Sequence, residues 1–282
     1  MSLANGFNRM ESEAGSLLRR CAGNVMTAFN VLTRSPRIRV SRVSSLRALA
    51  IIVGIAIVVF MILAWTLDAA VSRGAGNLPR WIISAFDDIT DFGKSGWFLW
   101  PLGSLFLSLA ALPPLLTPVS QRVLAAVMVR IGFLFAAIAV PSLFVTIVKR
   151  IIGRARPGVG GSLDPFLFIP FKWHAAYAGM PSGHATTAFA VLVAFGSLWP
   201  RGRTVLLIYA LLIALSRVIV TAHYPTDVLA GALVGVTGAI MVRRYFAQRG
   251  LGFSIGPAGE IHQLPGPSLK RIKAVARGLL AP

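Results

Sequence analysis

The sequence contains few charged residues, few acids and almost no cysteine. Only 13% of its 282 residues are charged, whereas 56% are hydrophobic, which excludes an ordinary soluble domain. The composition indicates instead a membrane protein with several spans. The single cysteine, Cys21, excludes an intrachain disulfide, and no cluster of metal ligands surrounds it in the sequence.

Acidic residues number only 9 against 28 Lys and Arg, so the formal net charge is +19. An excess of this size is typical of nucleic-acid-binding proteins when the cations form one continuous basic face. Here the cations flank apolar runs, a distribution that membrane orientation explains better. We therefore expect membrane lipids as partners, and no nucleic acid.

Six apolar runs lie along the chain, and a transmembrane helix takes about 20 apolar residues. The runs are 48–67, 97–116, 123–148, 182–199, 204–221 and 227–242, of which the last three are short or interrupted. We predict an all-α fold: a polytopic membrane protein built as a bundle of six transmembrane helices. This helical domain occupies 48–242, between basic tails at 1–47 and 243–282.

Apolar residues recur at helical spacing in both tails. In 1–47 the pattern fits either an amphipathic helix on the membrane surface or a loose basic tail, and both interpretations stay open. From Ser268 onward, a basic amphipathic pattern suits an anionic membrane surface. Within the last apolar run, Gly231 and Gly235 have the GxxxG spacing of closely packed helices. We interpret this spacing as packing inside the bundle in preference to a dimer face.

The distribution of Lys and Arg predicts which side of the membrane each loop faces. With the N-terminus inside, the inner segments carry 18 of these residues and the outer segments carry 8, so both termini are expected in the cytoplasm. Arg outnumbers Lys 23 to 5, as GC-rich coding produces, and we assign the protein to the inner membrane of a bacterium. Five of the eight outer cations lie in one long loop, 149–181, which indicates that they serve an anionic ligand.

Three short motifs carry most of the polar residues that interrupt the apolar sequence. The first motif is Lys149 followed after six residues by Arg156-Pro157, the second is Pro-Ser-Gly-His at 181–184, and the third is Ser216-Arg217 followed by His223 and Asp227. In a six-helix topology all of these positions fall at helix ends on the outer side of the membrane. They would therefore meet at one surface, although 78 residues separate Lys149 from Asp227.

The second motif has the character of a helix N-terminus. Ser182 suits an N-cap, and Gly183 lets another group approach the backbone closely. The free N–H groups of a first helical turn form a site for an anion. His184 lies in that turn, where it can donate a proton to the bound group.

The other motif residues supply the remaining parts that phosphoryl transfer requires. Lys149, Arg156 and Arg217 can hold the charge of a phosphate ester. His223 is the candidate nucleophile, because Asp227, the only acid between Asp164 and Glu260, can accept the proton on its other ring nitrogen. His184 is then left as the general acid for the departing alkoxide. No cofactor is assigned.

Together the three motifs resemble the signature of the type 2 phosphatidic acid phosphatase family, whose site is similar to that of the vanadium haloperoxidases. The resemblance covers 149–227 and implies a membrane phosphatase that acts on a lipid phosphate or diphosphate. It also implies a phosphohistidine at His223 that water later hydrolyses, without a metal. The alternatives are a lipid phosphotransferase, a haloperoxidase and a non-enzymatic phospholipid-binding member. The apolar spans argue against the second, and the intact histidines against the third.

Between the first two apolar runs, Asp87, Asp88 and Asp91 hold three of the nine acids. Carboxylates are ligands for hard divalent cations, so a metal site is one interpretation. We favour the other, in which they form the solvated face of a short surface helix. The identity of the lipid and the oligomeric state stay open.

Overall fold

The computed structural model describes residues 46–112 and 117–280 and, before them, 15, 16, 18, 19, 22, 23, 26, 30 and 33–37. The surface helix predicted within 1–47 therefore falls mainly outside the described residues, as do 113–116 of the second predicted span. The chain divides into two compact units. One comprises 41–99 and 136–243 and contains every predicted site residue, and the other comprises 1–40, 100–135 and 244–282.

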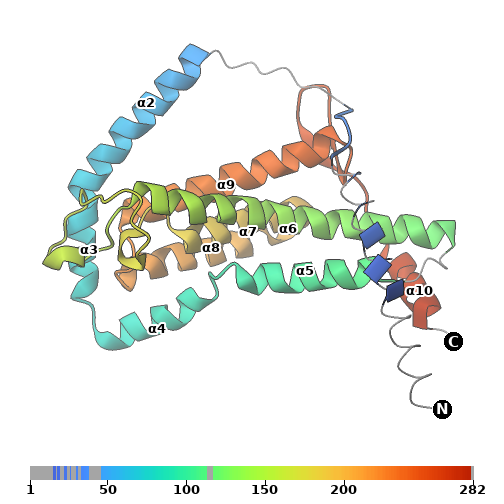
Figure 1. Cartoon of the computed structure of the whole chain (residues 1–282), viewed down its shortest axis with the longest axis horizontal. Helices are drawn as coiled ribbons and strands as arrows, with labels where there is room; N and C mark the ends of the chain where they lie inside the picture. The colour runs from blue at the N-terminus through green and yellow to red at the C-terminus, as the bar shows by residue number, and fades with distance from the viewer. Residues whose placement is uncertain are drawn as a thin grey trace. The chain divides into compact units, whose positions relative to one another are not determined.

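A helix forms at each of the six apolar runs (Figure 1). In chain order these helices are α2 (Leu46–Leu63), α5 (Gly96–Ala110), α6 (Pro118–Ile152), α7 (Gly183–Leu198), α8 (Arg203–Ile219) and α9 (Pro225–Gln248). Four helical stretches are long and apolar enough to cross a membrane: Val53–Gly76, Pro118–Ile152, Pro200–Ile219 and Pro225–Gln248. The chain is thus a mostly helical membrane protein, and the count of six crossing helices stays a prediction.

Two helical runs extend beyond their predicted ends. α2 continues through the π-helix η1 (Ala64–Asp68) into α3 (Ala69–Gly76), so the predicted end at 67 was too early. α6 continues to Ile152, which places Lys149 in its last turn and not in the following loop. The predicted spans end where the first charged residue lowers the hydropathy. The helix itself can continue past that residue, because the helix dipole favours a cation in the last turn.

The segments between these helices are short or loosely folded. α4 (Arg80–Asp91) is the surface helix expected around the three aspartates. The loop from 153 to 182 contains the single 3-10 turns η2 (Val159–Gly161) and η3 (Ala175–Tyr177) and an isolated β-bridge between Arg154 and Phe168. A further 3-10 turn, η4 (Pro200–Gly202), joins α7 to α8, and a core of Ala188, Ala210 and Ile213 is buried between these two helices.

In the other unit, a β-hairpin and a helix follow α9. β1 (Phe253–Ile255) pairs antiparallel with β2 (Ile261–Gln263), and the buried Phe253 ring lies 4.7 Å from Phe133. The all-α prediction was wrong at this hairpin, because strands of three residues are too short to show an alternating pattern. The basic amphipathic pattern that begins at Ser268 forms helix α10 (Leu269–Leu280).

The glycines of α9 bring this helix into contact with the start of α7. A Cβ atom on Gly231 would lie 2.4 Å from the Ser182 carbonyl oxygen, and one on Gly235 would lie 2.4 Å from that of Thr186. The Thr186 hydroxyl also donates a hydrogen bond to the Gly231 carbonyl at 3.0 Å. The prediction that the GxxxG spacing serves packing inside the bundle is therefore confirmed.

We expect Gly235→Ala to separate α9 from α7 and to lower stability by about 1–3 kcal/mol, the usual cost of overpacking. Gly54→Ala is the matched control, because no atom lies within 4 Å of its Cβ position and the gain in helix propensity is the same. The midpoint of thermal unfolding in detergent measures the difference. Equal midpoints for the two variants would contradict the close helix contact.

Candidate functional site

The residues of the three motifs lie at the ends of four helices of one unit. Lys149 occupies the last turn of α6, and Arg217 the last turn of α8. Ser182 is the N-cap of α7, so Gly183 and His184 open that helix. His223 lies in the turn between α8 and α9, Asp227 lies in the first turn of α9, and Arg156 lies four residues beyond the end of α6.

Several of these side chains lie close enough to one another to interact electrostatically. Arg156 interacts with Lys149, Asp227 and Arg217. His184 interacts with Arg217 and with His223. The charged and histidine residues of the three motifs therefore lie near one another, and their roles in catalysis stay a prediction.

Within the described part of the chain, the cationic side chains of this group are not neutralised by ion pairs. Lys149, Arg156 and Arg217 form no ion pair with a carboxylate among the described residues. The Nε atoms of Arg156 and Arg217 are buried without a hydrogen-bond partner. Burial lowers the pKa of the Arg156 guanidinium from its usual value, with Asp227 acting in the opposite direction. Buried polar atoms without partners are rare and call for an explanation, and an anionic ligand explains these.

The start of α7 adds further partners for an anion. Together, Lys149, Arg156, Arg217 and the start of α7 are called the anion cradle. The Ser182 hydroxyl is buried and makes no capping hydrogen bond, so the predicted N-cap position is right but its side chain is free for another partner. No atom lies within 4 Å of the Cβ position of Gly183, which leaves open space at the helix N-terminus. The first N–H groups of a helix have no acceptor within the helix and favour an anion.

His223 is held beside Asp227 in a buried setting. Its Nδ1 lies 3.8 Å from Oδ2 of Asp227, which is longer than a hydrogen bond, and its backbone N–H donates to the Arg217 carbonyl. Burial lowers the pKa of His223 below its ordinary value, Arg217 and Arg156 act in the same direction, and Asp227 opposes them. A lowered pKa keeps the imidazole neutral, as a nucleophile must be.

The last turn of α4 and the residues that follow it form a wall of the site that the sequence did not reveal. A Cβ atom on Gly93 would lie 2.9 Å from Cδ2 of His184, so this glycine packs directly on the imidazole. Thr90 accepts a hydrogen bond of 2.7 Å from Nη1 of Arg217. The Tyr209 hydroxyl of α8 donates to the Phe92 carbonyl at 2.9 Å. No motif marks these residues, and the two hydrogen bonds span 127 and 117 positions of sequence.

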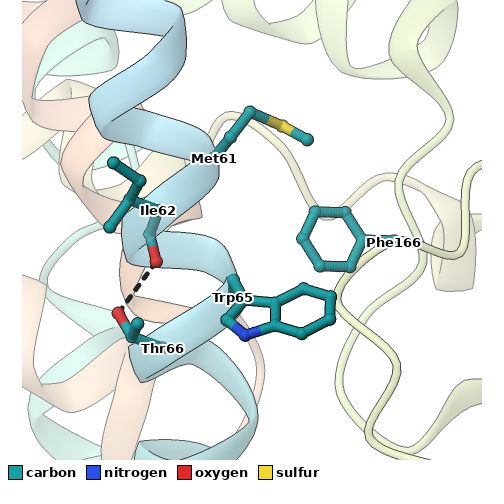
Figure 2. A pocket seen from close by; sticks show the side chains of 5 residues that line it. All are labelled: Met61, Ile62, Trp65, Thr66 and Phe166. Atoms are coloured by element: carbon teal, nitrogen blue, oxygen red, sulfur yellow. Dashed lines mark hydrogen bonds between the residues drawn. The ribbon is translucent and has the colours of Figure 1, made fainter.

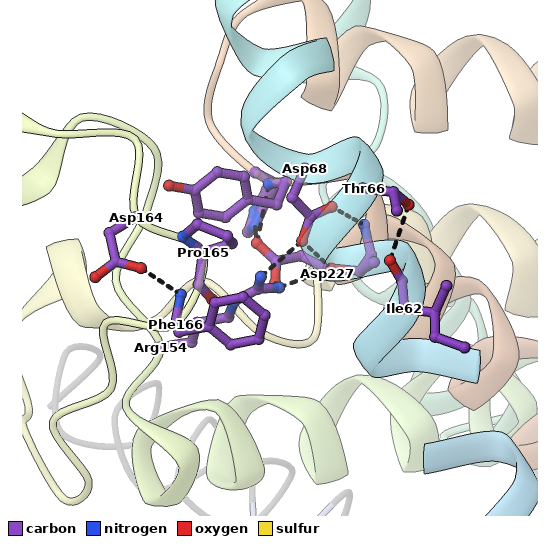
Figure 3. A network of polar contacts seen from close by, with 11 residues as sticks. Ile62, Thr66, Asp68, Arg154, Asp164, Pro165, Phe166 and Asp227 are labelled. Carbon is purple, nitrogen blue, oxygen red and sulfur yellow. Dashed lines mark hydrogen bonds and ion pairs between the residues drawn. The ribbon is translucent and has the colours of Figure 1, made fainter. Parts of the chain in front are cut away.

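A second feature that the sequence did not reveal is a buried ionic network around Arg154 (Figure 3). Arg154 pairs with Asp227 at 2.5 Å and with Asp68 at 2.7 Å, and all three side chains are fully buried. Thr226 bonds to both Arg154 and Asp68. One signal was available in the sequence: Asp68 is an acid directly after an apolar run, where acids are costly and tend to be functional.

The three aspartates of α4 are exposed. Asp91 pairs with Lys94 at 2.8 Å. Among the described residues, no group of three or more His, Cys, Asp or Glu side chains is placed to hold a metal ion. The interpretation as the solvated face of a surface helix fits this arrangement.

An apolar hollow of about 290 Å³ lies between the first helical run and the loop that follows α6 (Figure 2). It is lined by Met61, Ile62, Trp65, Thr66 and Phe166. The ring centroids of Trp65 and Phe166 are 6.2 Å apart, and the ring planes are tilted by 44°. None of the motif residues lines this hollow, so it is separate from the anion cradle.

Comparisons with known proteins identify several to which this chain is similar. The family model of the PAP2 superfamily matches residues 130–251. The chain is 35% identical over 187 residues to the lipid A 1-phosphatase of Rhizobium johnstonii, which covers 66% of this chain and 77% of that protein. The same identity and share of this chain hold for the lipid A 1-phosphatase of Rhizobium etli, of which 81% is covered. A phosphatidylglycerolphosphate phosphatase from Bacillus subtilis has a solved structure with a TM-score of 0.46, 21% identity and coverage of 66% of this chain and 91% of its own.

We expect Thr90→Val to release Arg217 and to weaken the binding of an oxyanion. A hydrogen bond to a charged group contributes roughly 1.5–3 kcal/mol, which corresponds to roughly a tenfold or greater loss of affinity. Affinity for orthovanadate, obtained from the shift in melting temperature on titration, measures the effect. Thr90→Ser should retain affinity. Thr66→Val is the matched control, since its hydroxyl bonds only within its own helix, to Ile62. Equal affinity in both Val variants would rule out a role for Thr90.

Proposed function

Because this chain belongs to the type 2 phosphatidic acid phosphatase family, the PAP2 superfamily, we propose that it hydrolyses a lipid phosphate through a phosphohistidine at His223. The chain is a lipid phosphatase of the PAP2 type and thus hydrolyses phosphoric monoesters. The observation that carries the mechanism is that Lys149, Arg156 and Arg217 form no ion pair with a carboxylate in the described part of the chain, while the Nε atoms of both arginines and the Ser182 hydroxyl are buried without a hydrogen-bond partner. Such a cradle suits a phosphate dianion.

In the first step the three cations and the N–H groups at the start of α7 hold the phosphate oxygens. Nδ1 of His223 faces Asp227, which leaves Nε2 as the attacking nitrogen. A bond forms between Nε2 and phosphorus while the bond from phosphorus to the lipid oxygen breaks. Charge that develops on the phosphoryl oxygens meets fixed donors, which lowers the barrier.

His184 serves the oxygen that leaves. The bound dianion favours the protonated imidazolium, which then transfers its proton to the departing alkoxide. In the second step the neutral His184 removes a proton from a water molecule that attacks phosphorus. The bond to His223 breaks, inorganic phosphate forms, and both histidines return to their starting states. An alcohol in place of water would make the same site a phosphotransferase.

For the substrate, we place lipid A bearing a 1-phosphate first, because two relatives that this chain largely covers carry the name lipid A 1-phosphatase. Phosphatidate, phosphatidylglycerol phosphate and undecaprenyl diphosphate present a phosphate on an apolar body in the same way. Assays of the purified protein against these four lipids, with released phosphate measured, test the proposal. The absence of release from all four would reject it.

The two histidines should fail in different ways. His223→Ala removes the nucleophile, so no substrate should restore turnover. His184→Ala removes a general acid, an effect of roughly 10²–10⁴-fold on a lipid substrate. The deficit of His184→Ala should shrink on a nitrophenyl phosphate, whose leaving group is stable as an anion. Wild-type activity should also persist in EDTA, since no metal ligands are assigned.

Other results would revise the mechanism in a defined way. Rescue of His223→Ala by the nitrophenyl substrate would reverse the two roles. Equal losses for both variants on both substrates would remove the assignment of nucleophile and acid. Loss of activity in chelator, with recovery on adding a divalent cation, would overturn the metal-free mechanism.

We further propose that the site faces the outer side of the inner membrane, as the balance of Lys and Arg predicts. In a Cys21→Ser background, Ser162→Cys lies in the loop after α6 and Ser268→Cys lies beyond the β-hairpin, and both positions are exposed. A membrane-impermeant maleimide should label position 162 in intact spheroplasts and position 268 only after lysis. The reverse pattern would place the site on the cytoplasmic side.

A further inference from the structure

We propose that Asp68 and Arg154 are positioning residues for catalysis, which hold Asp227 in the orientation that presents one carboxylate oxygen to His223. The inference rests on the proposed roles of His223 and Asp227. Asp68 belongs to the first helical run and lies outside the residues that the PAP2 family model matches, 130–251. The first helical run, which consists of α2, η1 and α3, would thus contribute a side chain to the catalytic unit.

Arg154 is fixed at every nitrogen of its guanidinium group. Nη1 donates to Oδ1 of Asp227 at 2.5 Å and to the Thr226 hydroxyl at 2.8 Å. Nη2 donates to Oδ2 of Asp68 at 2.7 Å, and Nε donates to the Pro165 carbonyl at 2.9 Å. The rigid fork of a guanidinium bonded in this way leaves its position no freedom, so Arg154 sets where Oδ1 of Asp227 lies.

The two oxygens of the Asp227 carboxylate have separate partners. Oδ1 is bound by Arg154, whereas Oδ2 accepts the backbone N–H of Tyr224 at 3.0 Å and faces Nδ1 of His223 at 3.8 Å. Because the carboxylate is planar, fixing Oδ1 also fixes the direction of Oδ2. A turn of the Asp227 side chain would remove the acceptor from the nucleophile.

Asp68 holds Arg154 from the opposite side. Its Oδ1 accepts the backbone N–H of Thr226 at 3.0 Å, and its Oδ2 accepts the Thr226 hydroxyl at 2.5 Å as well as Arg154. Asp68 is the last residue of the π-helix η1, and π-turns inside helices occur frequently at functional sites. Without Asp68, one end of the guanidinium would be buried with no acidic partner, and Arg154 could turn away from Asp227.

A network of this kind could also serve only to join the first helical run to α9. The two roles differ in what they predict for the reaction. A joining role affects how much folded protein forms, whereas a positioning role lowers turnover in folded protein and acts only when Asp227 is present. The phosphate cradle contains neither Asp68 nor Arg154, so a positioning defect should leave oxyanion binding unchanged.

The test compares Asp68→Asn, Asp227→Asn and the double variant, with Glu260→Gln as a control at an exposed carboxylate of the other unit. Melting temperature and elution volume in detergent establish that each protein is folded. We expect Asp68→Asn to lower kcat roughly 10²-fold, the scale of a misplaced reacting group, with KM and vanadate inhibition close to wild type. In the Asp227→Asn background, the same change should cost little more. Glu260→Gln should match wild type.

Three outcomes would overturn the inference. The first is wild-type turnover in folded Asp68→Asn, and the second is an equal loss of turnover in the presence and absence of the Asp227 carboxylate.

Arg154→Lys provides a second variant, since an ammonium keeps the charge but cannot bridge both carboxylates. It should show the same fall in kcat with unchanged vanadate inhibition. The third outcome is that neither variant accumulates as folded protein, which would make the network a joining element only. A wild-type protein that releases no phosphate from any of the four lipids would instead reject the proposed function.

Discussion

Asp227 connects the three sequence motifs, and the site depends on its contacts. Its backbone carbonyl accepts the N–H of Ser182 at 2.9 Å, which ties the start of α9 to the start of α7. Its carboxylate faces His223 on one side and receives Arg154, from the loop of the first motif, on the other. One residue thus joins the anion site, the nucleophile and the cation-rich loop. Loss of its carboxylate would free His223 and Arg154, whereas the backbone hydrogen bond to Ser182 does not depend on the side chain.

The cations of the site are placed in two different electrostatic settings. Arg154 is fully neutralised by two carboxylates, which its burial requires, because an unpaired buried charge is strongly destabilising. Arg156 and Arg217 lie nearby but have no carboxylate ion pair in the described part of the chain. Arg154 can therefore hold the protein together while the others retain their attraction for a ligand. A bound phosphate dianion would supply the negative charge that no ion pair provides to Arg156 and Arg217.

The sequence predicted where the helices lie and identified motif residues that the structure places at or near helix ends, because both signals are local. A long apolar run marks a helix, and each motif fixes residue types at short spacing. The sequence did not predict Asp68 and Thr90, since each acts through a partner 86 and 127 positions away. Single-sequence patterns do not contain such pairings. The β-hairpin after α9 was missed for another reason: its strands have three residues each, fewer than the roughly four to eight over which an alternating pattern identifies a strand.

The positions of the site residues depend on helix packing as well as on polar contacts. Glycine at 231 lets α9 approach the carbonyl of Ser182 to a distance that any Cβ atom would prevent. The same approach brings the Ser182 N–H within hydrogen-bond distance of the Asp227 carbonyl, four residues earlier on α9. Four residues are about one helical turn, so the glycine and the carbonyl lie on the same face of α9. Small residues in an apolar helix therefore do more than allow close packing. They place the start of α7 next to His223 and Asp227.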